Sequence, residues 1–139
     1  MILVHELTAI CRNGWKYTRD HLTHRHLSNE AYDICAVIYT NDLCNQDTVV
    51  KALKMDKSSV AKIIRKCEKE GIIFRMKDQK DMRNYCLSLT EEGKEIICNL
   101  IDTVALWQKE AMSCLSEEEI ADFTRMVEKI RENTRILNK

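Results

Sequence analysis

The segment between residues 56 and 93 constrains the fold more than any other part of the chain. Asp56 is a good N-cap for a helix that reaches about Glu70, and Gly71 follows where a helix C-cap favours a left-handed residue. One face of this helix is apolar, through Val60, Ile63, Ile64 and Cys67. The opposite face carries Ser58, Ala61, Lys62, Arg65 and Lys69. We therefore expect one side of the helix to pack on a core and the other to face a partner.

Two β-type runs follow this helix, at residues 72–76 and 85–89. The polar stretch 77–83 separates them, so we predict an antiparallel hairpin with a charged tip. Thr90 then caps a helix that starts with two glutamates and runs to about Cys114.

Helices are also predicted on both sides of this segment, and the chain contains no proline to interrupt them. They cover residues 2–25, a stretch after Ser28, a short stretch after Asn45, and residues after the capping box Ser116–Glu119. The predicted fold class is mainly α with a small β-hairpin.

The chain has no net charge overall, because 22 Lys and Arg residues balance 22 Asp and Glu residues. The distribution is uneven. Residues 51–83 hold 11 basic and 5 acidic side chains, net +6, whereas residues 1–50 are net −2 and residues 84–139 net −4. A local basic surface attracts phosphates whatever the total charge. The basic segment is therefore a candidate nucleic-acid surface, the alternative being a solvated charged face.

Two short helices, a turn, an amphipathic helix and a hairpin describe a winged helix-turn-helix, whose second motif helix enters the major groove. The candidate recognition-helix contacts are Ser58, Ser59, Lys62 and Arg65, with Lys57 and Lys80 as further phosphate contacts. At the hairpin tip, Arg83 is a candidate for the minor groove, and Asp81 could pair with it and fix its direction. An ion pair without any DNA role is the alternative.

These residues resemble the multiple antibiotic resistance regulator (MarR) family of bacterial transcription regulators, over the segment from Asp47 to Gly93. The most specific part is RMKDQKDMRNYCLSLTEEG, which is similar to the family's wing signature. Its matching positions are Asp81, Arg83, Leu87, Leu89, Thr90 and Gly93. Gln79 and Met82 stand where the family often has Pro and a second Arg, so one wing cation is absent.

The resemblance implies an obligate homodimer that reads pseudo-palindromic promoter DNA, acts as a repressor and is released by a small effector. It divides the chain into an N-terminal dimerisation helix (1–27), a winged helix-turn-helix domain (28–93) and C-terminal dimerisation helices (94–139). The effector would be a small aromatic molecule between the dimerisation helices and the winged domain. Trp15, Tyr17, Tyr39 and Trp107 are candidates to line its pocket, although aromatic residues at helical spacing are often ordinary core.

Seven cysteines without a CxxC pair predict reduced, mostly buried thiols rather than a zinc site or a disulfide scaffold. Some branches of the family sense hydroperoxides through a cysteine in the first helix, so Cys11 is an alternative sensor. His21, His24 and His26 cluster, but their spacing does not put them on one helix face, and we expect a solvated turn rather than a metal site. No cofactor is expected.

No catalytic motif occurs: there is no Gly-rich phosphate loop, nucleophile elbow or HExxH sequence, so we do not expect an enzyme. The first residues lack a signal-peptide pattern and no apolar run approaches membrane length, so we expect a cytoplasmic protein. The rival interpretation from another class is a winged helix that docks an acidic protein through its basic face.

Overall fold

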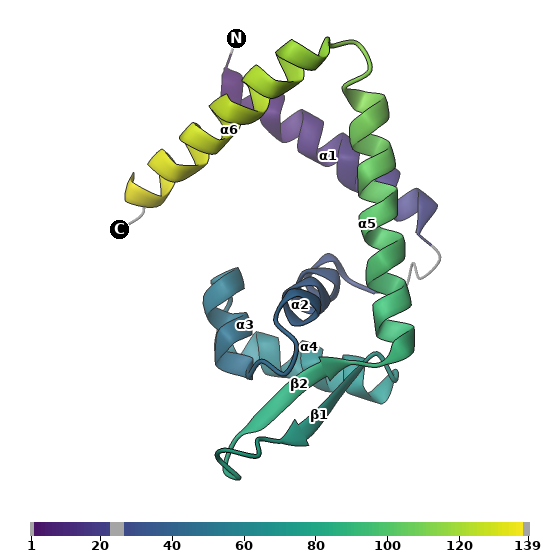
Figure 1. Cartoon of the computed structure of the whole chain (residues 1–139), viewed down its shortest axis with the longest axis vertical. Coiled ribbons are helices and arrows are strands. Elements are labelled where there is room, and N and C mark those ends of the chain that lie inside the picture. The colour runs from purple at the N-terminus through teal and green to yellow at the C-terminus, as the bar shows by residue number, and fades with distance from the viewer. Residues whose placement is uncertain (1, 23–26, 138–139) are drawn as a thin grey trace.

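The structure is a computed structural model that describes residues 2–22 and 27–137. In chain order its elements are α1 (Leu3–His21), α2 (Asn29–Thr40), α3 (Gln46–Leu53), α4 (Lys57–Lys69), β1 (Ile73–Lys77), β2 (Tyr85–Leu89), α5 (Glu91–Ala111) and α6 (Glu117–Leu137). Figure 1 shows two regions connected by α5: the first holds α2, α3, α4 and the hairpin, and the second holds α1 and α6. The predicted fold class, a mainly helical winged helix with one small hairpin, is confirmed.

Side-chain caps begin most of the helices where the sequence predicts them. The side chains of Ser28, Asn45, Asp56 and Thr90 each accept a hydrogen bond from a backbone N–H in the first turn of the following helix. Before α6, the backbone N–H of Glu119 donates to Ser116 Oγ at 3.2 Å, and the Ser116 N–H donates to the Glu119 carboxylate at 2.8 Å. This reciprocal pair is the predicted capping box.

The hairpin has a regular antiparallel register, from Ile73 opposite Leu89 to Lys77 opposite Tyr85. The alternation predicted for β2 is present on its inner face, where Leu87 and Leu89 are buried. On the outer face Ser88 is also buried, and its hydroxyl is satisfied by donating to Asp42 Oδ1 at 2.5 Å.

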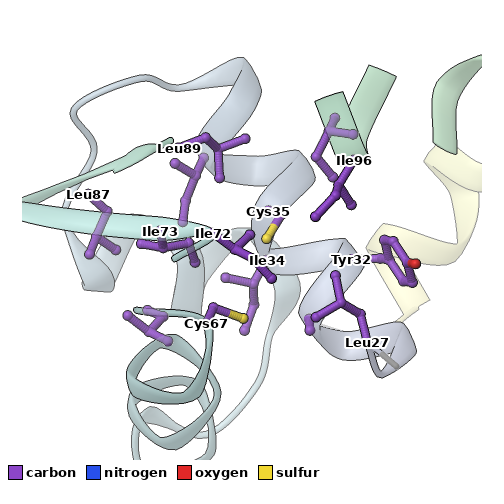
Figure 2. Close-up of a cluster of buried hydrophobic side chains, with 14 of the residues drawn as sticks. Leu27, Tyr32, Ile34, Cys35, Cys67, Ile72, Ile73, Leu87, Leu89 and Ile96 are labelled. Carbon is purple, nitrogen blue, oxygen red and sulfur yellow. The ribbon is translucent and has the colours of Figure 1, made fainter. Parts of the chain in front are cut away.

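One hydrophobic core holds the winged region together (Figure 2). It joins residues of α2, α4, both strands and the start of α5; its fully buried members include Ile34, Cys35, Ile38, Val60, Ile64, Cys67, Ile72, Ile73, Ile96 and Ile97. Every buried residue of α4 comes from its predicted apolar face, and Ile63 packs at the margin. The opposite face of α4 is thereby left for contacts outside the core.

The helices outside this core are far less covered. α1 packs on α5, and a Cβ added to Gly14 would lie 2.9 Å from Cη2 of Trp107. Among the described residues, α6 packs against no other element as extensively as α1 packs on α5. Within the same described ranges, no helix combines the length and apolarity that crossing a membrane requires.

Several expectations need correction. α1 ends at His21, with an extended Leu22 after it, and residues 23–25 of the predicted helix lie outside the described residues. α5 ends at Ala111 rather than near Cys114. After Ala111 the backbone tightens into a turn, in which the Leu115 N–H donates to the Met112 carbonyl at 2.9 Å.

The expectation of mostly buried thiols is wrong. All seven cysteines are free, but only Cys35 and Cys67 are buried, while Cys11, Cys98 and Cys114 are exposed. Of the three exposed thiols, Cys11 lies on α1, Cys98 lies on α5 and Cys114 follows α5.

Candidate nucleic-acid interface

A helix-turn-helix is formed by α3 and α4, which pack against each other across a short turn. The turn is made possible by Lys54, which adopts a left-handed conformation with φ 53° at the end of α3. Asp56 then begins α4 as its N-cap. The sequence therefore places α4 as the second helix of the motif.

Asp56 organises the first turn of α4. Its Oδ1 atom accepts hydrogen bonds from the Ser58 hydroxyl at 2.6 Å and from the Ser59 backbone N–H at 2.9 Å. These two bonds stabilise the carboxylate and hold the pKa of Asp56 well below its usual range. A DNA acceptor would have to compete with this carboxylate for the Ser58 hydroxyl. Ser59 is half-buried, and its backbone N–H donates to Asp56.

Lys62 and Arg65 lie on the exposed face of α4, as predicted. Neither forms an ion pair with another residue in the described ranges. Ser58 lies one turn before Lys62 and is exposed, and Ala61 is half-buried. Small side chains beside long cations allow a helix to approach a groove closely while the cations reach outward.

The wing tip is held by its own acidic residues. The Asp78 N–H donates to the Asn84 carbonyl at 3.0 Å, closing the loop, and Asp78 Oδ1 accepts from the Lys80 N–H at 2.8 Å. Asp81 Oδ1 accepts from the Arg83 N–H at 3.1 Å, and Asp81 Oδ2 accepts from the Asn84 amide at 3.0 Å. Asp81 therefore contacts the backbone of Arg83 rather than its guanidinium, and shapes the loop that carries it.

Of the two further phosphate candidates, Lys57 is already paired. Its Nζ atom lies 3.0 Å from Asp47 Oδ1 in an exposed contact between α4 and α3. Lys80 is exposed at the wing tip, and only its backbone N–H is engaged by Asp78. The eight predicted DNA-binding residues thus fall on two places, the start and outer face of α4 and the tip of the wing.

Sequence reasoning missed the contact that joins these two places. Arg75 on β1 forms a two-point ion pair with Glu68 in the last turn of α4, with both N–O distances at 2.7 Å. Periodicity within one helix or one strand cannot indicate a pair that spans two elements. The only available signal was that opposite charges flank a tight turn seven residues apart.

The four aromatic residues proposed for an effector pocket do not gather in one place. Trp107 lines an apolar hollow of about 550 Å³ between α1, α5 and α6, together with Ile10 and Phe123. Tyr39 lines a separate hollow of about 200 Å³ beside Lys94, and its hydroxyl lies 3.8 Å from Cys98 Sγ.

The other two aromatic residues lie on α1. Trp15 is exposed, and Tyr17 stacks on His21 with ring centroids 4.0 Å apart. The Nδ1–H of His21 also donates to the Tyr17 carbonyl at 2.8 Å, so His21 is engaged within its own helix. The other two histidines of that cluster, His24 and His26, lie outside the described residues.

Comparison with known proteins agrees with the description of α3, α4 and the hairpin as a winged helix-turn-helix. The family model of MarR matches residues 27–85, which include α2, α3, α4 and β1. A relative from Thauera aromatica, a "putative transcriptional regulatory protein for hcr operon", is 28% identical over 88 residues. That match covers 63% of this chain and 53% of the relative, so the chain spans about half the length of that curated protein.

Solved structures match over nearly the whole chain. A MarR transcriptional regulator from Methanosarcina mazei superposes with a TM-score of 0.82 at 25% identity, covering 97% of each chain. BpsR from Bordetella bronchiseptica, solved in work on the regulation of its DNA binding by 6-hydroxynicotinic acid, gives a TM-score of 0.75 at 15% identity and covers 94% of this chain and 99% of its own. The winged helix-turn-helix, the wing motif and these matches agree with one another: over residues 27–85 this chain matches the model of the MarR family.

Proposed function

We propose that this protein is a dimeric transcriptional regulator that binds double-stranded DNA through α4 and the wing. The observation that carries the proposal is the exposed face of α4, where Lys62 and Arg65 have no ion-pair partner within the described residues. Arg83, which follows α4 in the sequence, is exposed at the tip of the wing. Unpaired cations on a helix that follows a helix-turn-helix turn suit the major groove.

The dimer is proposed from the apolar surface of the terminal helices. The stripe predicted on α6 is left open in its C-terminal half, where Val127, Ile130 and Leu137 are exposed. On α1, Leu3 and Ile10 are exposed as well. Exposed apolar surface of this extent marks a protein interface. A two-fold dimer would present two copies of α4 to half-sites about one helical turn apart, in a pseudo-palindrome.

An effector of small aromatic type is the proposed signal, and repression of a promoter is the proposed outcome of DNA binding. The apolar hollow that Trp107 lines, about 550 Å³, has a volume typical of small-molecule sites. BpsR, whose DNA binding responds to 6-hydroxynicotinic acid, is a precedent for an aromatic effector on this fold. A ligand that favours one spacing of the two α4 helices would shift the population away from the DNA-bound form. We place this regulator in the cytoplasm and assign it no catalytic activity.

A thiol sensor is the second candidate for the signal, because Cys11 is exposed on α1. Exposure is one of the two requirements for a reactive thiol, the other being a favoured thiolate. Cys98 and Cys114 are exposed too, so Cys11 must be distinguished from them by experiment.

Binding to duplex DNA as a function of salt tests the proposal. We expect affinity for the DNA flanking the protein's own gene to fall steeply, on the order of 1,000-fold between about 50 and 200 mM salt if about six phosphates are contacted. Lys62→Ala/Arg65→Ala should weaken binding and flatten the salt dependence, whereas Lys16→Ala/Arg19→Ala on α1 removes the same charges without effect. Unchanged binding by the α4 variant would instead favour a basic face that docks an acidic protein.

A further inference from the structure

Glu68 and Arg75 connect the recognition helix directly to the wing. Nε of Arg75 donates to Oε1 of Glu68 at 2.7 Å, and Nη2 donates to Oε2 at 2.7 Å. Two parallel charge-assisted bonds fix the relative orientation of both groups, which a single contact does not.

Taken together, the side chains of this pair are less exposed to solvent than those of the other ion pairs among the described residues. The Arg75 and Glu68 side chains are 35% and 23% exposed, whereas in each of the other pairs at least one side chain is more than half exposed. Tyr85, a diagonal neighbour on β2, places its ring centroid 5.6 Å from the Arg75 guanidinium. The hydrogen-bonded carboxylate of Glu68 raises the pKa of Arg75 above its ordinary value.

The pair joins the two parts that would contact DNA. Glu68 lies in the last turn of α4, and β1 ends two residues after Arg75, where the wing tip begins. The other end of α4 is tied to α3 by the contact between Lys57 and Asp47 at 3.0 Å. Each end of α4 therefore forms an ion pair with another element, the first turn with α3 and the last turn with the wing.

We propose that Glu68, Arg75 and Tyr85 form a positioning unit that sets the angle between α4 and the wing, so that both can engage one duplex. The inference rests on the proposed function. A preorganised angle spares the protein the entropy of ordering the wing when it binds. None of the three residues needs to touch DNA for this role.

Glu68→Gln separates positioning from a direct contact. Arg75 also lines a polar hollow of about 220 Å³ with Lys57 and Asn84, so its guanidinium could instead bind a phosphate. If Arg75 binds a phosphate directly, removing the acidic charge of Glu68 should leave DNA affinity unchanged or raise it. A positioning role predicts the opposite, a loss of about 5- to 10-fold for Glu68→Gln and for Arg75→Gln alike.

The decisive measurement repeats both variants in an Arg83→Ala background. If the unit acts by placing the wing, its loss should cost less than about 2-fold once the wing contact is gone. A general loss of folding would persist in that background, and urea denaturation of each variant measures it separately. Glu91→Gln, which breaks the exposed pair with Lys94 on α5, is the matched control and should bind as the wild type does.

Three results would overturn the inference. Equal losses with and without Arg83 would assign the effect to stability, and unchanged or tighter binding by Glu68→Gln would assign Arg75 a direct phosphate contact. Wild-type protein that shows no salt-dependent duplex binding would overturn the proposed function itself. That failure is visible before any variant is compared.

Discussion

The carbonyl oxygen of Ile72 lies 2.3 Å from the position that a Cβ atom on Gly93 would occupy. Gly93 stands in the first turn of α5, and its N–H donates to the Thr90 hydroxyl oxygen at 3.1 Å. The same hydroxyl donates to the Gly71 carbonyl at 2.6 Å. The Thr-x-x-Gly motif therefore locks the start of α5 onto the turn between α4 and β1, and only glycine leaves room for that backbone.

We expect Gly93→Ala to destabilise the protein by about 1–3 kcal/mol, because the added methyl group meets backbone rather than a side chain that can move. The free energy of unfolding from urea denaturation, followed by circular dichroism, measures the change. A loss below about 0.5 kcal/mol would contradict the close approach.

Gly14→Ala is the matched comparison for this prediction. Its added methyl group would lie 2.9 Å from the rim of the Trp107 ring, a partly exposed side chain that can shift. In a helix interior, alanine is also more favourable than glycine by about 1 kcal/mol. We expect the two effects nearly to cancel, so that stability changes by less than about 1 kcal/mol.

The sequence predicts local features well because their causes are local. The N-caps Ser28, Asn45, Asp56 and Thr90 bond to backbone only three residues away, so composition and spacing are sufficient to place them. The outward face of α4 follows equally from its period.

Features that depend on contacts between elements could not be predicted in this way. Arg75 meets Glu68 only because the turn at Gly71 brings β1 against α4. Asp81 is oriented by the Arg83 backbone N–H and the Asn84 side-chain amide of its own loop, so the opposite charges of Asp81 and Arg83 do not indicate its actual partners. The burial of each cysteine depends on which helix faces the core, and three thiols lie on surfaces that no core covers.

Asp56 should make stability depend on pH in the acid range. Its pKa is lowered in the folded state by the bonds from Ser58 and Ser59, whereas the pKa of an unfolded Asp is about 3.9. The stabilising effect is therefore complete above the unfolded pKa and is lost as the pH falls toward the folded one. Urea denaturation between about pH 6 and pH 3 should show a steeper loss for the wild type than for Asp56→Asn, which can still cap α4 but does not titrate. Parallel curves would show that Asp56 does not contribute.

The open stripe on α6 predicts a specific route to the monomer. The Ile130 side chain is 49% exposed in the single chain. In the proposed dimer this side chain would be buried against the partner. Ile130→Glu would place a charge in that interface without a partner for it, so we expect dissociation at micromolar concentration. Sedimentation equilibrium measures the association constant. Ala121→Glu on the opposite side of α6 adds the same charge and should remain a dimer; if both variants behave as the wild type does, α6 is not the interface.

Cys11 and an effector pocket make different predictions for how DNA is released. Oxidation of a thiol adds atoms to a defined residue, so hydroperoxide treatment should raise the mass of the peptide that contains Cys11 as DNA affinity falls. Under the thiol hypothesis, Cys11→Ser keeps DNA binding but no longer releases DNA with peroxide. Cys98→Ser and Cys114→Ser, which remove the other two exposed thiols, should respond as the wild type does. Release that is unchanged in Cys11→Ser would exclude this thiol as the sensor. If no cysteine variant changes the response, the hollow that Trp107 lines becomes the place to test with aromatic acids.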